Sequence, residues 1–193
     1  MTRLDRGFKS WVERAATGLR REMRLKSHEP LKPSQVAEFL DVRLMTPLDV
    51  PGVPREVLDQ LLRRDPSGWS AVSLTLNSTS LVIYNPKHSQ GRQASDIMHE
   101  LAHIILDHRP ATLILSHDGN TVMRSYDAKQ EEEANCLAWG LLLPRDALVN
   151  AKRLNHSTAE IADRYGVSQK LVTFRMDTTG VNRQFARVRT RSR

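Results

Sequence analysis

The sequence has little cysteine, few aromatic residues and no long apolar run. Of its 193 residues only Cys136 is a cysteine, and Phe, Trp and Tyr together make up 5%. A lone thiol cannot form an internal disulfide or a thiolate metal site, so any metal must be held by histidine and carboxylate groups. No segment approaches the roughly 18 apolar residues of a membrane-spanning helix, and the basic N-terminus has no apolar stretch typical of a signal peptide. These absences predict a cytoplasmic protein that makes no membrane contact.

The net charge of +7 is unevenly distributed along the chain. Residues 1–32 contain nine basic and four acidic side chains, residues 33–144 contain nine and fourteen, and residues 145–193 contain eleven and four. An acidic central part between two basic ends suits a metal-binding body whose ends meet an acidic partner or make weak contact with nucleic acid. An ordinary solvated surface explains the same pattern equally well.

The N-terminal part is predicted to form a basic amphipathic helix and a linker. From Leu4 to Met23 the apolar residues recur at spacings of three and four with Arg and Lys between them, which is the pattern of an amphipathic helix. Packing of this helix on its own domain is favoured over a membrane or partner surface. Ser27–Pro33 contains two prolines and few apolar residues, which is typical of a linker.

Short helices and a β-hairpin are predicted next. Helices are expected near Ser34–Leu40 and over Arg55–Arg64. Trp69–Leu76 and Ser80–Tyr84 are rich in Val, Leu, Thr and aromatic residues, and the turn-like Asn77-Ser78-Thr79 separates them. This arrangement predicts an antiparallel hairpin.

Two longer helices follow the hairpin. One begins after Gly91 and is expected over Ala94–Asp107, and the other runs from Asp127 to Leu143 and ends at Pro144. Between them Ala111–Ser116 is a weaker candidate for a strand, with a turn at residues 118–120. Helices that are mixed with a small hairpin or sheet predict an α+β fold.

The strongest chemical signal is the segment His99-Glu100-Leu101-Ala102-His103, which lies in an apolar helical pattern. Residues four apart lie on one face of a helix, so the imidazoles of His99 and His103 can bind one ion. Glu100 projects beside them, where a carboxylate can act as general base on an attacking water and later protonate a leaving amine. Zinc fits this chemistry because it lowers the pKa of bound water toward ~7. Two surface histidines on an amphipathic helix are the alternative, but apolar neighbours disfavour it.

A catalytic zinc site needs a third protein ligand, and the best candidates lie in Gln130–Asn135. Glu131 and Asn135 are four residues apart, so one can bind the metal while the other orients a histidine. This spacing favours Glu131, with Glu133 as the alternative, and predicts ligand atoms about 2.0–2.2 Å from the ion. Consecutive glutamates also favour the N-terminal end of a helix through its dipole, which is a sufficient reason for Glu132 and Glu133.

The remaining polar candidates are weaker. An oxyanion donor is required near the scissile carbonyl, and the candidates for it are Tyr84, His88, His117 and Tyr126. His108 follows His103 at i+5, which is predicted to point it away from the ligand face. Cys136 is predicted to be a small core residue and not a nucleophile.

Several motifs together resemble the ImmA/IrrE zinc metallo-endopeptidases over about residues 65–181. These motifs are Arg92-Gln93, His99–Leu106, Glu131-x-x-Ala134-Asn135, Leu141–Pro144 and Ala159–Ser168. Leu137 stands where the family favours Phe, and Trp139-Gly140 stands where small or helix-favouring residues are usual. Glycine within a helix costs about 1 kcal/mol, so a looser helix end is expected.

The resemblance implies a zincin-like fold in which His99, His103 and Glu131 bind Zn²⁺ and Glu100 is the general acid and base. It also implies a protein substrate, a helix-turn-helix repressor encoded nearby, and so a role in transcription regulation.

We expect four parts in the chain. These are an N-terminal helix and linker (1–32), a zincin-like peptidase domain (33–153), a helix-turn-helix-like segment (154–181) and a basic, disordered tail (182–193). Ser157–Arg175 has the pattern of helix, glycine turn and helix, and we expect it to be structural or to bind a partner. The alternative function is a regulator that binds DNA or a repressor without proteolysis, with Gln169 and Lys170 as base-reading groups.

Overall fold

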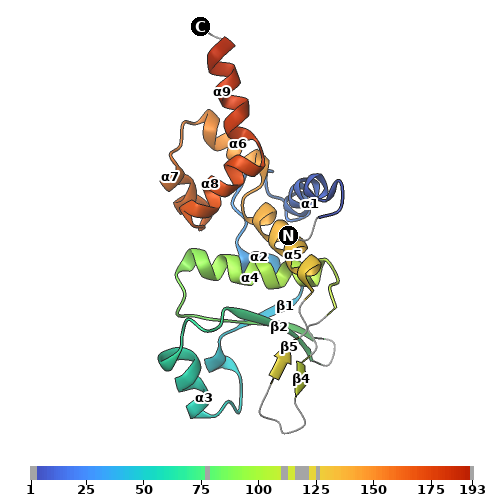
Figure 1. The fold of residues 1–193 in the computed structure, drawn as a ribbon, viewed down its shortest axis with the longest axis vertical. Helices are drawn as coiled ribbons and strands as arrows, with labels where there is room; N and C mark the ends of the chain where they lie inside the picture. Colours follow the sequence, from blue (N-terminus) through green and yellow to red (C-terminus); the bar gives the residue numbers. More distant parts are fainter. Residues whose placement is uncertain (1–3, 77–78, 110–112, 116–121, 125–126, 192–193) are drawn as a thin grey trace.

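Helices stack in layers on a small sheet (Figure 1). The computed structural model describes residues 4–76, 79–109, 113–115, 122–124 and 127–191. The layer next to the sheet contains α4 (Gln90–Ile105) and α2 (Pro33–Phe39), and the layer beyond it contains α5 (Ala128–Leu142) and α1 (Phe8–Glu22). The C-terminal helices stand above both layers. The predicted α+β class is confirmed.

The sheet has three strands in the order β1 (Val42–Met45), β3 (Thr79–Tyr84) and β2 (Ala71–Leu76). β2 and β3 form the predicted antiparallel hairpin, although its turn at residues 77–78 lies outside the described residues. β1 pairs in parallel with β3. The sequence does not predict β1, because four residues are too few to show an alternation of apolar and polar side chains. Among the strands that the structure describes, β2 lies at the edge of this sheet.

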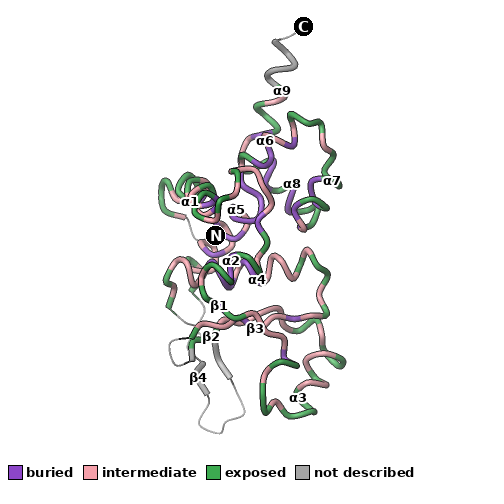
Figure 2. The backbone as a smooth tube through the Cα atoms, turned by 180° about the vertical axis from the view of Figure 1, so that it is seen from behind, coloured by how far each residue is buried: buried purple, intermediate pink, exposed green. Residues whose placement is uncertain are grey.

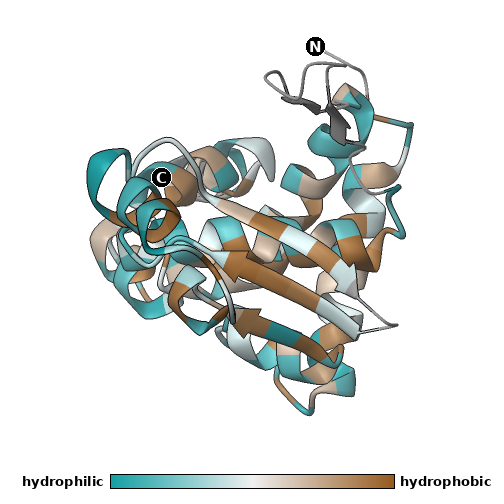
Figure 3. Ribbon diagram, turned by 90° about the horizontal axis from the view of Figure 1, so that it is seen from below, coloured by the Kyte–Doolittle hydropathy of each residue, from teal (hydrophilic) through white to brown (hydrophobic). Residues whose placement is uncertain are grey.

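The two faces of the sheet carry different side chains. Val82 on β3 is fully buried, and β3 packs against α4. Because side chains alternate along a strand, Ser73, which is paired with Val82, lies on the same face. Leu81 and Ile83 belong to the opposite face, and Figure 3 shows from below how apolar the strands are. The face next to α4 therefore carries a polar residue of β2.

A close contact between α1 and α5 explains the glycine within α5. Val12 on α1 and Leu141 on α5 are buried in one hydrophobic core, and Figure 2 shows buried residues concentrated in α5, α6 and α8. A Cβ at Gly140 would overlap Cγ1 of Val12. Glycine therefore lets the two helices approach closely. α5 stays helical past Gly140 to Leu142.

Four helices follow Pro144, and they are α6 (Arg145–Arg153), α7 (Thr158–Tyr165), α8 (Gln169–Thr178) and α9 (Val181–Arg191). α7 and α8 occupy the segment in which the sequence predicts a helix, a turn and a helix. Gly166 between them has φ +62°, a left-handed conformation that suits glycine. The turn packs on the start of α4, since a Cβ at Gly91 would lie 3.2 Å from the backbone nitrogen of Ser168. α6 is not predicted, because Pro144 is interpreted only as the end of a helix.

The segment for which the sequence predicts a disordered tail, residues 182–193, overlaps the last helix. α9 covers Val181–Arg191, and residues 192–193 lie outside the described residues. Val181 is buried and Phe185 packs on the core. These residues are four apart and share one face of the helix, so both apolar side chains face the core although the segment is rich in arginine.

Shorter elements complete the fold. α3 (Arg55–Asp59) continues as a π-helical turn over Gln60–Arg64, and the two together cover the predicted helix. A 3-10 turn covers Pro47–Asp49. β4 (Leu113–Leu115) pairs with β5 (Val122–Arg124) and lies within the predicted third strand, whereas the turn expected at residues 118–120 lies outside the described residues. None of the helices described here is long and apolar enough to cross a membrane.

Candidate metal centre

Helix α4 presents the His-Glu-x-x-His segment beside α5. It starts at Gln90, four residues before the expected Ala94. Met98, Leu101 and Ala102 are fully buried, and their burial fixes the rotation of the helix about its axis. His99 and His103 are one turn apart and remain partly exposed at the border of this buried face.

Helix α5 places Glu131 opposite these histidines. The carboxylate of Asp127 accepts hydrogen bonds from the backbone nitrogens of Lys129 at 2.9 Å and Gln130 at 3.2 Å. This capping starts the helix at Ala128 and leaves Glu131 in its first turn. The packing of α4 on α5 then brings Glu131 to the two histidines.

Three donor atoms from the two helices meet in one place. Nε2 of His103 lies 3.1 Å from Nε2 of His99. Glu131 places Oε2 3.2 Å from Nε2 of His99 and Oε1 3.7 Å from Nε2 of His103. A tetrahedral ion with bonds of about 2.1 Å would separate its ligand atoms by about 3.4 Å. The spacing of the donors therefore fits a single ion.

The chemistry of these donors also favours a cation. Two imidazole nitrogens face each other beside a carboxylate, and a cation can accept a lone pair from each of the three groups. Two imidazoles and one carboxylate are donors that zinc and related transition metals prefer. His99, His103 and Glu131 could hold a metal ion.

Glu133, the alternative third ligand, lies elsewhere. Its Oε2 is 3.3 Å from Nε2 of His108. Residues two apart on a helix point roughly 200° away from each other, so Glu131 and Glu133 cannot both face the same site. The phase of α5 gives Glu131 the position beside the two histidines.

His108 occupies a position that the sequence does not predict. It follows the end of α4, where Asp107 has φ +51°, so the i+5 rule for a continuous helix does not apply. Its Nδ1 lies 2.9 Å from Nδ1 of His103. When a histidine binds a metal through Nε2, its Nδ1 carries the proton and needs an acceptor, which fixes the tautomer and the ring orientation. His108 can accept this proton and donate its own Nε2–H to Glu133.

His99 lacks comparable support among the described residues. Its Nδ1 is buried and has no hydrogen-bond partner there. The signal that could have revealed His108 and Glu133 is the presence of one further histidine and one further glutamate beside the motif residues. Spacing does not show that the end of α4 turns His108 back toward His103.

Glu100 is buried and is held by the edge strand. Its Oε2 accepts hydrogen bonds from the backbone nitrogen of Ser73 at 2.9 Å and from the Ser73 hydroxyl at 2.6 Å. These bonds satisfy an oxygen whose burial would otherwise be costly. In an antiparallel strand the N–H and C=O of one residue point to the same side, so Ser73 directs its main chain to the outer edge of β2. Glu100 therefore lies at the border between α4 and the outer edge of β2.

The structure describes two of the four oxyanion-donor candidates. The side chain of His88 is 5% exposed, with Nδ1 2.7 Å from Oδ2 of Asp96 and Nε2 3.3 Å from Nδ2 of Asn85. This network ties the end of β3 to α4, which gives His88 a structural role. Tyr84 packs against the core, while His117 and Tyr126 lie outside the described residues.

Comparisons with known proteins point to the same region. Residues 55–177, which span α4 and α5, match the family model of the IrrE N-terminal-like peptidase domain. No curated protein matches the chain. Among solved structures, a Mycobacterium tuberculosis transcriptional regulator aligns with 90% of this chain at 17% identity and a TM-score of 0.49, and the chain spans 47% of the length of that protein.

Proposed function

The chain belongs to the IrrE N-terminal-like peptidase family, and from this premise we propose that it is a zinc-dependent endopeptidase. His99, His103 and Glu131 would hold the zinc, and Glu100 would act as general acid and base. The observation that carries the proposal is the convergence of three donor atoms from two helices beside a buried glutamate.

The residues around the centre have separable tasks. Zinc held there would lower the pKa of water and polarise the carbonyl of the cleaved peptide bond. Glu100 would take the proton of the attacking water and deliver it to the leaving amine. Ser73 keeps Glu100 in place, because two donors bind the same carboxylate oxygen. His108 and Glu133 would keep His103 in the tautomer that binds a metal through Nε2.

The outer edge of β2, which pairs with no other strand in the described part of the chain, is the proposed position of the substrate backbone. Alternate residues of an antiparallel edge strand direct their N–H and C=O groups outward, and an extended peptide can add to them as a further strand. Ser73 marks the point where this edge reaches Glu100. A peptide paired with β2 would thus pass beside the general base.

Metal analysis tests the centre directly. The purified chain should contain about one zinc ion, and His99→Ala should remove it, because two remaining ligands hold zinc poorly. Elemental analysis after dialysis gives the stoichiometry. His156→Ala, which changes a histidine far along the chain, serves as the control and should keep the metal. Full zinc content in His99→Ala would contradict the ligand assignment.

The proposed role of Glu100 has its own test. Glu100→Gln should keep zinc but lose peptidase activity, since an amide cannot accept the proton. Loss of a general base typically slows the reaction 10²- to 10⁴-fold. This corresponds to an activation free energy that is higher by about 2.7–5.5 kcal/mol. Glu56→Gln on the exposed surface of α3 is the matched control. Cleavage by Glu100→Gln at the rate of the unchanged chain would rule out this mechanism.

For the substrate we propose a helix-turn-helix transcriptional repressor. The family resemblance suggests this class of protein, and the basic ends of the chain, residues 1–32 and 145–193, could engage an acidic face of it. One side-chain pocket discriminates by only ~1–3 kcal/mol per methylene, so strong selectivity needs an extended docking surface.

Incubation with the repressor encoded beside this protein tests the choice of substrate. One discrete cut that a chelator abolishes is the expected result. An intact repressor, together with cleavage of generic unfolded protein, would instead indicate a peptidase of broad specificity.

A second candidate function is DNA binding through α7 and α8. The observation that favours it is the left-handed turn at Gly166, followed by exposed Gln169 and Lys170 at the start of α8. Arg175, however, is buried and bound to Glu13, so it cannot also contact a phosphate. DNA binding would appear as salt-sensitive retention on duplex DNA that Lys170→Ala weakens. Absence of such retention would leave α7 and α8 with the structural or partner-binding role expected from the sequence.

A further inference from the structure

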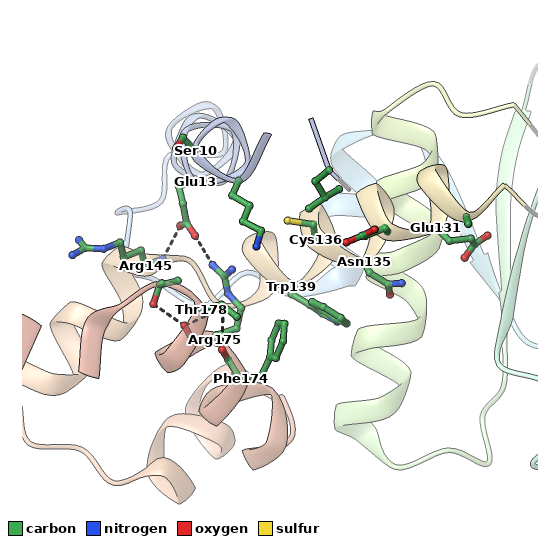
Figure 4. Close-up of a pocket in the computed structure, with 15 residues that line it drawn as sticks. Ser10, Glu13, Glu131, Asn135, Cys136, Trp139, Arg145, Phe174, Arg175 and Thr178 are labelled. Carbon is green, nitrogen blue, oxygen red and sulfur yellow. Dashed lines mark hydrogen bonds and ion pairs between the residues drawn. The ribbon is translucent and has the colours of Figure 1, made fainter. Parts of the chain in front are cut away.

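A groove of about 640 Å³ runs along α5 between α1 and α8. Figure 4 shows Glu131 near one end and Arg145 near the other, with Trp139 and Phe174 between them. We call it the α5 groove, and its lining from α5 includes Glu131, Asn135, Cys136 and Trp139. Glu131 lines the groove and is also one of the three candidate metal ligands, so the groove reaches the candidate metal centre at this residue.

The α5 groove has the length of a short peptide segment. Glu131, Asn135 and Trp139 follow one another at spacings of four, so they form a stripe on one side of the helix. Eight residues of helix correspond to about 12 Å along its axis. An extended chain advances about 3.3 Å per residue, so Trp139 lies three to four substrate residues away from a bond that is cleaved beside Glu131.

An aromatic pair forms the apolar middle of the groove. The rings of Trp139 and Phe174 meet edge to face with centroids 4.9 Å apart. Phe174 remains 43% exposed, although most large apolar side chains of α8 are buried. An aromatic edge of this kind gains from contact with a further apolar or aromatic side chain.

The end of the α5 groove opposite Glu131 carries Arg145 and Arg175, with Glu13 as an acidic neighbour (Figure 4). Lys9 and Glu132 also line the groove. Glu13 is bound to Arg175, and the guanidinium of Arg145 donates to the neutral amide of Gln184. The remaining positive charge would attract a carboxylate on a ligand.

We infer that the α5 groove binds the substrate polypeptide on one side of the cleaved bond and takes a large apolar or aromatic side chain against Trp139 and Phe174. This anchor residue lies three or four positions from the cleaved bond, and an acidic residue beyond it meets Arg145. The inference rests on the proposed peptidase function, and it makes α8 a part of substrate recognition.

Two parallel measurements on one peptide pool test the inference. The pool is a mixture of peptides from a digested proteome, identified by mass spectrometry. In the first measurement, zinc-loaded full-length Glu100→Gln is immobilised and the retained peptides are sequenced. In the second, the zinc-loaded unchanged chain cleaves the pool and the residues around each cut are tabulated. Both are repeated with Phe174→Ala, and with Phe39→Ala as the matched control, since Phe39 is an equally exposed phenylalanine on α2.

Peptides with Phe, Tyr, Trp, Leu or Met should be retained at least tenfold above their share of the pool. Cuts should show the same preference at the third or fourth residue on one side only. Phe174→Ala should lose both preferences while it keeps its zinc, and Phe39→Ala should keep both preferences. A tenfold change corresponds to 1.4 kcal/mol.

The outcomes separate this inference from the proposed function. In one outcome, peptides are retained in a way that depends on Phe174, but the unchanged chain cleaves none of them. The groove would then still be a peptide-binding site, whereas the peptidase function and the position of the anchor residue would be overturned. Cleavage with no preference at the third or fourth residue, or a preference that Phe174→Ala keeps, would overturn the groove and leave the peptidase function intact. Absence of both retention and cleavage would overturn both.

Discussion

Two clusters of polar side chains in this molecule are built in opposite ways. In the first, His99, His103 and Glu131 bring lone pairs together at separations of 3.1–3.7 Å. In the second, Arg175 donates to the carbonyl of Leu143 and pairs with Glu13, whose other oxygen accepts from the backbone nitrogen of Arg145. The first gathers acceptors that a cation would satisfy, whereas the second pairs donors of Arg175 and Arg145 with acceptors of the chain itself.

This difference separates a binding site from a structural tie. The Glu13–Arg175 cluster joins α1 to α8 across 162 positions of the chain, and it is complete without a ligand. The histidine–glutamate cluster has a carboxylate and two imidazoles facing one point, which is an arrangement that favours a metal ion. Loss of the structural tie should therefore lower stability without removing metal, and loss of support around the histidines should do the reverse.

Arg175→Ala should have the largest effect on stability. Removing one partner of a buried ion pair leaves the other unpaired, which typically costs about 3–5 kcal/mol. Glu13 is partly exposed and keeps its bond to Arg145, so we expect a loss of about 3 kcal/mol in the free energy of unfolding. Urea denaturation measures it.

Zinc content of the folded Arg175→Ala chain should stay at the level of the unchanged chain. Arg153→Ala removes an exposed arginine from the end of α6 and serves as the control, with an expected change within about 0.5 kcal/mol. Loss of metal from folded Arg175→Ala would break the comparison, since it would show that the two clusters depend on each other.

His108→Ala should act on the first cluster. Removal of a group that orients a histidine ligand typically weakens metal affinity 10–100-fold, about 1.4–2.8 kcal/mol. Competition with a chromophoric zinc chelator measures the affinity. The melting temperature of the metal-free variant should fall by much less than that of the metal-free Arg175→Ala chain.

Glu133→Gln tests the next contact outward from His108. An amide oxygen can still accept the Nε2–H of His108 but carries no charge, so its effect should be smaller than that of His108→Ala. Zinc affinity of His108→Ala equal to that of the unchanged chain would show that the contact with His103 does not position the ligand.

The part of the candidate site that can be predicted from the sequence is the part whose geometry depends on helical spacing. His99, Glu100 and His103 are neighbours on one helix, and Glu131 follows from the phase of a second helix, so their positions can be derived from a period of 3.6 residues. The position of His108 could not be derived in this way, because the positive φ of Asp107 ends the helical repeat before His108. Whether a peptide is cleaved at this centre remains a prediction.

Contacts between distant segments are the part that the sequence does not show. The pairing of β1 with β3, the ion pair of Glu13 with Arg175 and the order of α9 all depend on which surfaces meet in the folded chain. Gly140 illustrates the problem, since it is a cost for an isolated helix but a requirement where Val12 crosses it. Helix propensity alone therefore does not tell whether a glycine stabilises or destabilises the folded chain, because the segment that packs against it must also be known.

Gly140→Ala tests the close packing of α1 on α5 and should change the free energy of unfolding less than Arg175→Ala does. Overpacking typically costs about 1–3 kcal/mol, and alanine in a helix returns up to about 1 kcal/mol, so we expect a net loss of about 1–2 kcal/mol in the free energy of unfolding. Gly18→Ala is the matched control on α1, because a Cβ there meets no atom within 4 Å. It should be neutral or stabilising by up to about 1 kcal/mol. A stabilised Gly140→Ala chain would mean that α1 does not pack as closely on α5 as described.

The smallest expected effect is on the reactivity of the Cys136 thiol. Cys136 lies on α5 between the two clusters and lines the α5 groove. Burial raises the pKa of its thiol above the ordinary value of 9.0, so the reactive thiolate forms at higher pH than in an unfolded chain. Alkylation by iodoacetamide at pH 8 should therefore be slower in the folded protein than in urea, and its pH profile should be displaced upward. Because the folded pKa is the higher one, the stability that the neutral thiol contributes is present below the unfolded pKa and is lost as the pH rises through the folded pKa. Equal alkylation rates in the folded and unfolded chains would contradict the partial burial of Cys136 beside the α5 groove.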